Sequence, residues 1–168
     1  TGSISTFSYN PDARTIALKG ATITGMFAMH PTANGNIAFS MDAASSVANT
    51  TGGGPHVSGT GLLLYTANGS IDTSTPNGTG INGAISAPDG AALVAITSGA
   101  GSNISITTGA TAVLSGRLGG LAARTDSTGV IDLNVAGPLQ QMTDGRLDES
   151  PRGAVVCPPG ACCWSRIM

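Results

Sequence analysis

The side chains of this chain that are best able to ligate a metal lie near its C-terminal end. Cys157, Cys162 and Cys163 are the only cysteines, and the two histidines, His30 and His56, lie far from them in the sequence. Structural zinc sites need two Cys or His pairs, and this spacing provides one pair with a third thiol beside it. We therefore predict no metal site. We expect the three cysteines to be free thiols; one disulfide among them, or a bond between subunits, is the alternative in an oxidising compartment.

A second candidate for chemistry is the sequence GTGING at Gly78–Gly83, which matches the dinucleotide pattern G-x-G-x-x-G. That pattern binds a pyrophosphate only where a strand precedes it and a helix begins within it. Pro76 and Pro88 flank the motif and leave no room for a helix of three turns. We therefore predict that no nucleotide and no other cofactor is bound.

Groups for nucleophilic or acid–base catalysis are sparse. There is no G-x-S-x-G motif, and Glu149 is the only glutamate. Glycoside hydrolysis needs two carboxylates that face each other. Five aspartates are interpreted as turn or strand-edge residues that bind local backbone: Asp42, Asp72, Asp89, Asp126 and Asp132. The sequence thus predicts no catalytic residue, and the protein is expected not to be an enzyme.

Composition excludes several classes of partner. Charged residues make up 10% of the chain, against about 25% in an average soluble protein, and the net charge is −2. Seven basic residues spread over 168 positions do not form the patch that nucleic-acid binding requires. No apolar run approaches the roughly 18 residues that span a bilayer, so we predict no membrane span.

Short runs of aliphatic and β-branched residues, separated by Gly, Asn, Ser and Thr, predict an all-β protein. The segment TANGNIAFS at Thr32–Ser40 returns as TANGSIDTS at Thr66–Ser74. Asn-Gly between apolar runs is typical of a β-hairpin. A three-residue loop that ends at Gly35 pairs Met29 with Phe39 and makes one face of the hairpin apolar. Possible contact loops are the tips Asn34, Gly35, Asn68 and Gly69.

Two further segments fit the same plan. A loop at Ser98–Ser102 places Ile96 opposite Ile104 and Val94 opposite Ile106. A loop at residues 127–129 places Leu121 and Ala123 opposite Val135 and Leu133, with Arg124 opposite Asp132 on the other face. We therefore predict an antiparallel β-sandwich or barrel built from successive hairpins.

A parallel β-solenoid is the alternative fold. Candidate units begin near Gly25, Gly61, Gly90 and Gly120, which gives spacings of 36, 29 and 30 residues. A unit of about 30 residues with three short strands is typical of one solenoid coil. The repeat is approximate, and no residue recurs in it at a fixed position.

The composition changes near Pro138. Residues 15–139 contain eight charged side chains, whereas the much shorter segment 140–168 contains six, together with every Cys and the only Trp. We predict a β domain over residues 1–139 and an extended or weakly ordered C-terminal arm over residues 140–168.

In its weakly charged, Gly/Ser/Thr/Asn-rich composition and its corner pattern, the segment 1–139 resembles exposed β-rich structural proteins of tailed phages, namely decoration, tail and fibre proteins, and bacterial surface or pilus β-modules. The resemblance implies a non-enzymatic structural protein of a virion or cell surface that works as a homo-oligomer or beside other subunits. One alternative is a β-module that binds a glycan or receptor through the hairpin tips. Another is a polysaccharide-acting β-helix enzyme.

Overall fold

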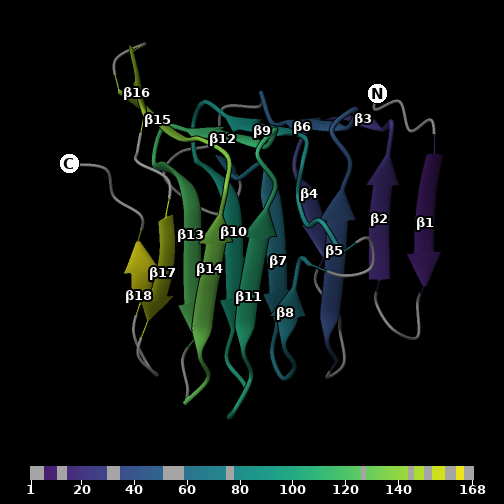
Figure 1. The fold of residues 1–168 in the computed structure, drawn as a ribbon, viewed down its shortest axis with the longest axis vertical. Helices are drawn as coiled ribbons and strands as arrows, with labels where there is room; N and C mark the ends of the chain where they lie inside the picture. The colour runs from purple at the N-terminus through teal and green to yellow at the C-terminus, as the bar shows by residue number, and fades with distance from the viewer. Residues whose placement is uncertain are drawn as a thin grey trace.

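The fold is known from a computed structural model, which describes residues 6–10, 15–29, 35–50, 59–74, 78–125, 128–143, 146–149, 153–157 and 162–164. All regular structure in this part of the chain is β, and the chain winds as a parallel β-solenoid (Figure 1). Each coil contributes one short strand to each of three sheets.

The strands follow one another in groups of three along the chain. The first coil contains β2 (Thr15–Lys19), β3 (Thr22–Thr24) and β4 (Phe27–Met29). The second contains β5 (Ile37–Met41), β6 (Ser46–Ala48) and β7 (Leu62–Thr66), and the third β8 (Ile71–Asp72), β9 (Ala84–Ala87) and β10 (Ala91–Thr97). The fourth contains β11 (Ile104–Thr108), β12 (Val113–Gly116) and β13 (Gly119–Thr125), and β14 (Ile131–Val135) and β15 (Leu139–Thr143) begin a fifth.

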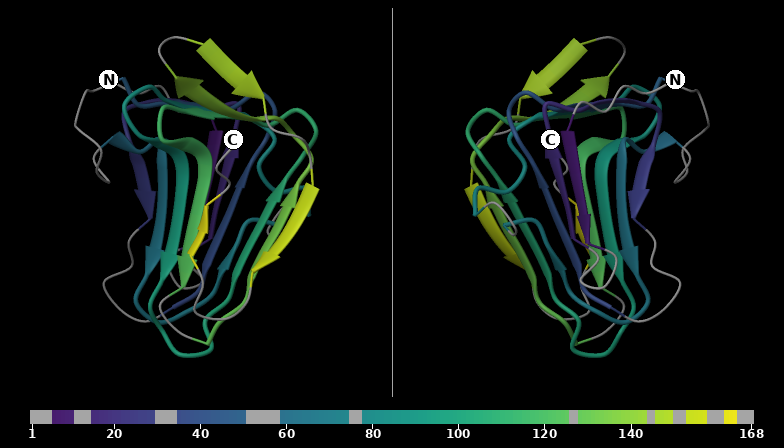
Figure 2. Two further views of the ribbon diagram at one scale, coloured as in Figure 1. Left: turned by 90° about the vertical axis from the view of Figure 1, so that its left-hand side faces the viewer. Right: turned by 90° about the vertical axis from the view of Figure 1, so that its right-hand side faces the viewer.

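Every third strand lies in the same sheet. The seven-stranded sheet contains β2-β5-β8-β11-β14, the five-stranded sheet β4-β7-β10-β13, and the six-stranded sheet β3-β6-β9-β12-β15, all paired in parallel. Viewed along the solenoid axis, the seven- and five-stranded sheets converge at one corner and the six-stranded sheet closes the opposite side (Figure 2). The cross-section is therefore triangular.

The antiparallel strands of this solenoid lie at its two ends. At the N-terminal end, β1 (Thr6–Asn10) pairs antiparallel with β2. At the C-terminal end, β16 (Arg146–Glu149), β17 (Gly153–Cys157) and β18 (Cys162–Trp164) pair antiparallel with β15, β14 and β13. The expected boundary between a domain 1–139 and an arm 140–168 remains a prediction, and the described part of residues 140–168 runs along the edges of the last coil.

The prediction of an antiparallel sandwich or barrel is wrong. Ile96 lies beside Tyr65 and Arg124, and Ile104 beside Ile71 and Ile131, so these two isoleucines belong to different sheets. The hairpin strands are instead consecutive walls of one coil. Alternation of apolar residues indicates which residues can share one face of a strand. It does not indicate whether that strand pairs with the next strand in the sequence or with the equivalent strand of the next coil. The parallel solenoid, considered as the alternative, describes the fold.

Aliphatic side chains from all three sheets fill the interior. In each sheet the inward positions of successive coils stack in register, as Leu62, Leu93 and Leu121 do in the five-stranded sheet. Ile37, Ile71, Ile104 and Ile131 form the matching row of the seven-stranded sheet, each almost fully buried. Burying one such side chain contributes about 1.5–3 kcal/mol, so each coil is stabilised chiefly by its neighbours.

Candidate functional site

Gly35 and Asn68, from the two TANG segments, lie next to each other at the corner between the five- and seven-stranded sheets. The amide of Gly35 donates to the carbonyl of Asn68 at 2.8 Å, and the Thr66 hydroxyl donates to the carbonyl of Gly35 at 2.9 Å. Gly69 has φ of +152°, and a Cβ there would collide with the backbone of Gly35. The glycines that end the two segments are thus held together at the same corner of successive coils.

A chain of polar side chains links the coils along this corner. The carboxamide oxygen of Asn36 accepts from the amide of Ser70 at 2.8 Å, and the Ser70 hydroxyl accepts from the amide of Asn103 at 3.1 Å. The carboxamide oxygen of Asn103 in turn accepts from the amide of Val130 at 2.9 Å. These polar groups are bonded within the protein. The predicted contact tip Asn34 lies outside the described residues, and Asn68 is exposed.

Buried threonines form a ladder just inside the same corner. Thr66, Thr97 and Thr125 stand in register at the ends of β7, β10 and β13, and all are buried. The Thr97 hydroxyl donates to the carbonyl of Gly69 at 3.0 Å, as Thr66 does to that of Gly35 one coil earlier. The expectation that no residue recurs at a fixed position of the repeat is therefore wrong. A signal existed, since each threonine ends a largely apolar strand and precedes a Gly-containing corner.

Asp42 organises the corner between the seven- and six-stranded sheets. Its carboxylate accepts from the Ser45 hydroxyl at 2.6 Å and from the Gly20 amide of the preceding coil at 3.0 Å. The Ser45 hydroxyl also accepts from the amide of Ala21 at 3.0 Å. The hydrogen bond from Ser45, aided by the backbone amides, lowers the pKa of Asp42 against the opposing effect of desolvation. This aspartate therefore acts as a structural anion in a turn, as the sequence indicated.

The outer face of the seven-stranded sheet is polar. Asp72, Ser105 and Asp132 stand in one row on successive strands. Thr107 and Asn134 form a second row in β11 and β14. Asp72 binds the amide and the hydroxyl of Ser74, each at 2.7 Å, whereas the Asp132 side chain is exposed. This face offers carboxylates and hydroxyls to a polar ligand.

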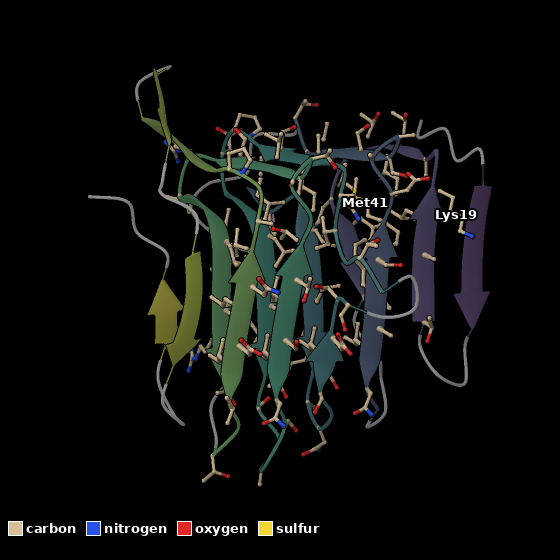
Figure 3. All side chains as sticks on the ribbon, viewed as in Figure 1. Lys19 and Met41 are labelled. Atoms are coloured by element: carbon tan, nitrogen blue, oxygen red, sulfur yellow. The ribbon has the colours of Figure 1, made fainter. Side chains whose placement is uncertain are left out.

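The outer face of the five-stranded sheet is largely apolar, with Arg124 as an exposed charged residue. One outward row contains Ala28, Leu63, Val94 and Ala122, and a second contains Tyr65, Ile96 and Arg124. Leu63, Tyr65, Val94 and Ile96 are half-buried by their neighbours and present aliphatic or aromatic surface to solvent. We call Leu63, Tyr65, Val94, Ile96 and Ala122, which lie on strands paired on both sides, the apolar face. Figure 3 shows the side chains of the described residues as sticks on these sheets.

The three outer faces thus differ in kind. On the six-stranded sheet the outward positions of β3, β6 and β9 are small: Thr22, Thr24, Ser46, Ala48, Ala84 and Ser86. Extended apolar surface is rare on monomeric proteins, and where it occurs it commonly marks an interaction site. The apolar face is therefore the strongest candidate functional surface in the described part of the chain.

The remaining candidates from the sequence take the following places. Cys157 stands opposite Ile131 at the end of β17, while Cys162 and Cys163 stand opposite Arg124 and Ala123 in β18. The disulfide among them stays a prediction. In the segment Gly78–Gly83, Gly78 and Gly80 have φ near +75°, and strand β9 follows at Ala84 where a nucleotide site would need a helix. His30 and His56 lie outside the described residues.

Within the described ranges, no group of three or more His, Cys, Asp or Glu side chains could hold a metal ion. The same part of the chain contains no helix with the length and hydropathy needed to cross a bilayer. The chain was also compared with protein-family models, with curated proteins and with solved structures. No family model, curated protein or solved structure matches it.

Proposed function

We propose that this protein is a non-enzymatic structural subunit of a virion or cell-surface assembly, and that it associates with copies of itself or decorates a larger particle. The observation that carries the proposal is the apolar face, an aliphatic and aromatic surface on a protein whose other described outer faces are polar or small.

A parallel solenoid suits such a role because its walls are extended and regular. Side chains at equivalent positions of successive coils form straight rows, so one face presents a repeated surface to a partner. Burial of apolar area contributes about 25 cal/mol per Å², and the low charge of the chain imposes little repulsion between copies. The small side chains of the six-stranded sheet allow close approach of a further neighbour.

The test is to place charge on the apolar face without disturbing the core. Val94→Glu combined with Ile96→Glu changes two outward side chains, and Ser105→Glu combined with Thr107→Glu changes two outward side chains of the polar face. We expect the wild type and the polar-face variant to form the same oligomer in sedimentation velocity. The apolar-face variant is expected to sediment as a smaller species with an unchanged circular-dichroism spectrum. A wild-type chain that stays monomeric at about 100 µM would count against the proposal.

A second candidate function, action on a polysaccharide, is favoured by one observation. Asp72 and Asp132 stand in the same outward row with one strand between them, which places their backbones about 10 Å apart. Carboxylate pairs separated by roughly 5–10 Å serve glycosidic cleavage. Under this hypothesis, Asp132→Asn abolishes release of reducing sugars from a polysaccharide panel, whereas Asp89→Asn, in the turn before β10, leaves it unchanged.

A further inference from the structure

The two ends of the solenoid are closed differently. At the C-terminal end, each of the three sheets receives an antiparallel strand, β16, β17 or β18. At the N-terminal end β1 extends the seven-stranded sheet, while β4 and β3 are the outermost strands of the other two sheets in the described part of the chain. The right-hand end of Figure 1 shows β1 and β2 extending beyond β4.

The backbone of β4 has hydrogen-bonding groups on its outer side. The Phe27 amide donates to the Gly61 carbonyl at 2.9 Å and so points along the sheet, toward β7. Because successive amides of a strand point to opposite sides, the Ala28 amide points away from β7, to the open edge. The same argument places the Thr24 amide on the open edge of β3, since the Gly25 amide donates to Ala48 in β6 at 2.8 Å.

The described edge strands carry neither charge nor proline, two features that commonly prevent strand addition. Natural edge strands are commonly protected by charged residues, by proline or by a bulge. The strands β1, β3 and β4 contain no charged residue and no proline, whereas β16, at the far end, has the sequence RLDE. Met26, at the corner between β3 and β4, is 42% exposed, and the side chain of Phe27 is half-buried. Among the described residues, the edge strands β1, β3 and β4 are thus uncharged, and the corner between β3 and β4 is apolar.

We propose that the N-terminal end binds the N-terminal end of a second copy, with β1 of each copy pairing with β4 of the other. The proposed two-fold axis is perpendicular to the solenoid axis and crosses the plane of the six-stranded sheet. Rotation about this axis brings the edge strand of the seven-stranded sheet of one copy next to the edge strand of the five-stranded sheet of the other. The strand β1 projects one strand beyond its own coil and fills the position next to β4 of the partner. The two β3 strands then face each other without pairing, because the distance between them exceeds the spacing of paired strands by about one strand, ~4.8 Å.

The proposal rests on the self-association part of the proposed function, and its test separates the two. Hydrogen–deuterium exchange of the wild type, resolved by NMR, is measured at low and high protein concentration. The Ala28 amide is expected to become protected at least tenfold as concentration rises, while the Thr24 amide remains fast. Amides beneath the apolar face give no such signal, because those strands are already paired within one copy.

Two variants complete the experiment. Ala28→Pro removes the outward donor, and Ala28→Ser keeps it in the same exposed position. We expect Ala28→Pro to abolish the end-to-end species in sedimentation velocity and Ala28→Ser to retain it, with matching circular-dichroism spectra. An oligomer whose Ala28 amide stays fast would overturn the end-to-end contact without affecting the apolar-face proposal. Protection of Thr24 together with Ala28 would overturn the reciprocal β1–β4 pairing.

Discussion

At the level of single residues, the corners are held by short polar side chains that bind the backbone of the adjacent coil. Asn36, Ser70 and Asn103 each accept an amide hydrogen from the next coil, and Asp42 accepts one from the preceding coil. The abundance of Asn, Ser and Thr therefore has a structural use. Each corner turns the chain out of a sheet, and a side-chain oxygen satisfies an amide that the sheet no longer pairs.

The strongest residue-scale prediction concerns Asp42. Replacing Asp42 by Asn weakens the bonds from Ser45 and Gly20, and we expect a loss of about 1 kcal/mol in the free energy of unfolding at pH 7. Since the pKa of Asp42 is lowered in the folded protein, its contribution is complete above the ordinary aspartate pKa of about 3.9. It is lost as the pH falls through the folded value.

Urea denaturation of wild type and Asp42→Asn from pH 7 down to pH 3 measures this effect. The two stability curves are expected to converge at the acidic end. Asp132→Asn, an exposed carboxylate on the polar face, serves as the control and should track the wild type. A difference between wild type and Asp42→Asn that stays constant with pH would show that the carboxylate charge has no role.

At the level of elements, the orientation of β10 distinguishes the observed fold from the hairpin prediction. The hairpin register points Val94 and Ile96 into the core. In the solenoid Leu93 and Ala95 are fully buried instead, and Val94 and Ile96 face outward. The sequence AALVAIT is apolar on both sides, so its alternation contains no information on which side is inside. Pairing of β10 with β7 and β13 in the neighbouring coils determines which of its sides faces the core.

The prediction for β10 compares aspartate at the buried position Ala95 with aspartate at the outward position Ile96. Ala95→Asp places a carboxylate at a site with 0% exposure, where an unpaired charge costs several kcal/mol, so we expect the solenoid to unfold. Ile96→Asp places the same charge outward and should leave a folded protein. Thermal unfolding followed by circular dichroism compares the two variants. A stable Ala95→Asp protein beside an unfolded Ile96→Asp protein would reverse the assignment of faces.

At the level of the whole molecule, the C-terminal strands act as a cap. A solenoid needs capping units because its last coil otherwise leaves open strand edges. β16, β17 and β18 cover one sheet each, and β16 contributes charged residues at the six-stranded sheet. A shortened chain that ends after residue 143 is therefore expected to aggregate, with thioflavin-T fluorescence several-fold above that of the full chain. A chain that ends after residue 164 keeps all three strands and should stay dispersed.

How much of the molecule follows from its sequence differs between features. The absence of helical periodicity predicts an all-β chain, which the structure confirms. The glycine spacing of 36, 29 and 30 residues corresponds to coils of unequal length. The inequality has a visible source, since the corners after β6 and β8 are longer than the others and blur the period. The sequence favours the antiparallel fold because the apolar registers of the candidate hairpins match, and the approximate repeat leaves the solenoid as the alternative.

The sequence by itself determined the local features: short strands, glycine and asparagine at the bends, few charges, and apolar runs long enough to build a core. Only the tertiary structure decided which strands are neighbours, because pairing partners one coil apart are separated by about 30 residues and leave no local mark. It also decided which side of each strand is outside. The apolar face follows from that choice, since Leu63, Tyr65, Val94 and Ile96 become a surface only when Leu62, Leu64, Leu93 and Ala95 occupy the interior.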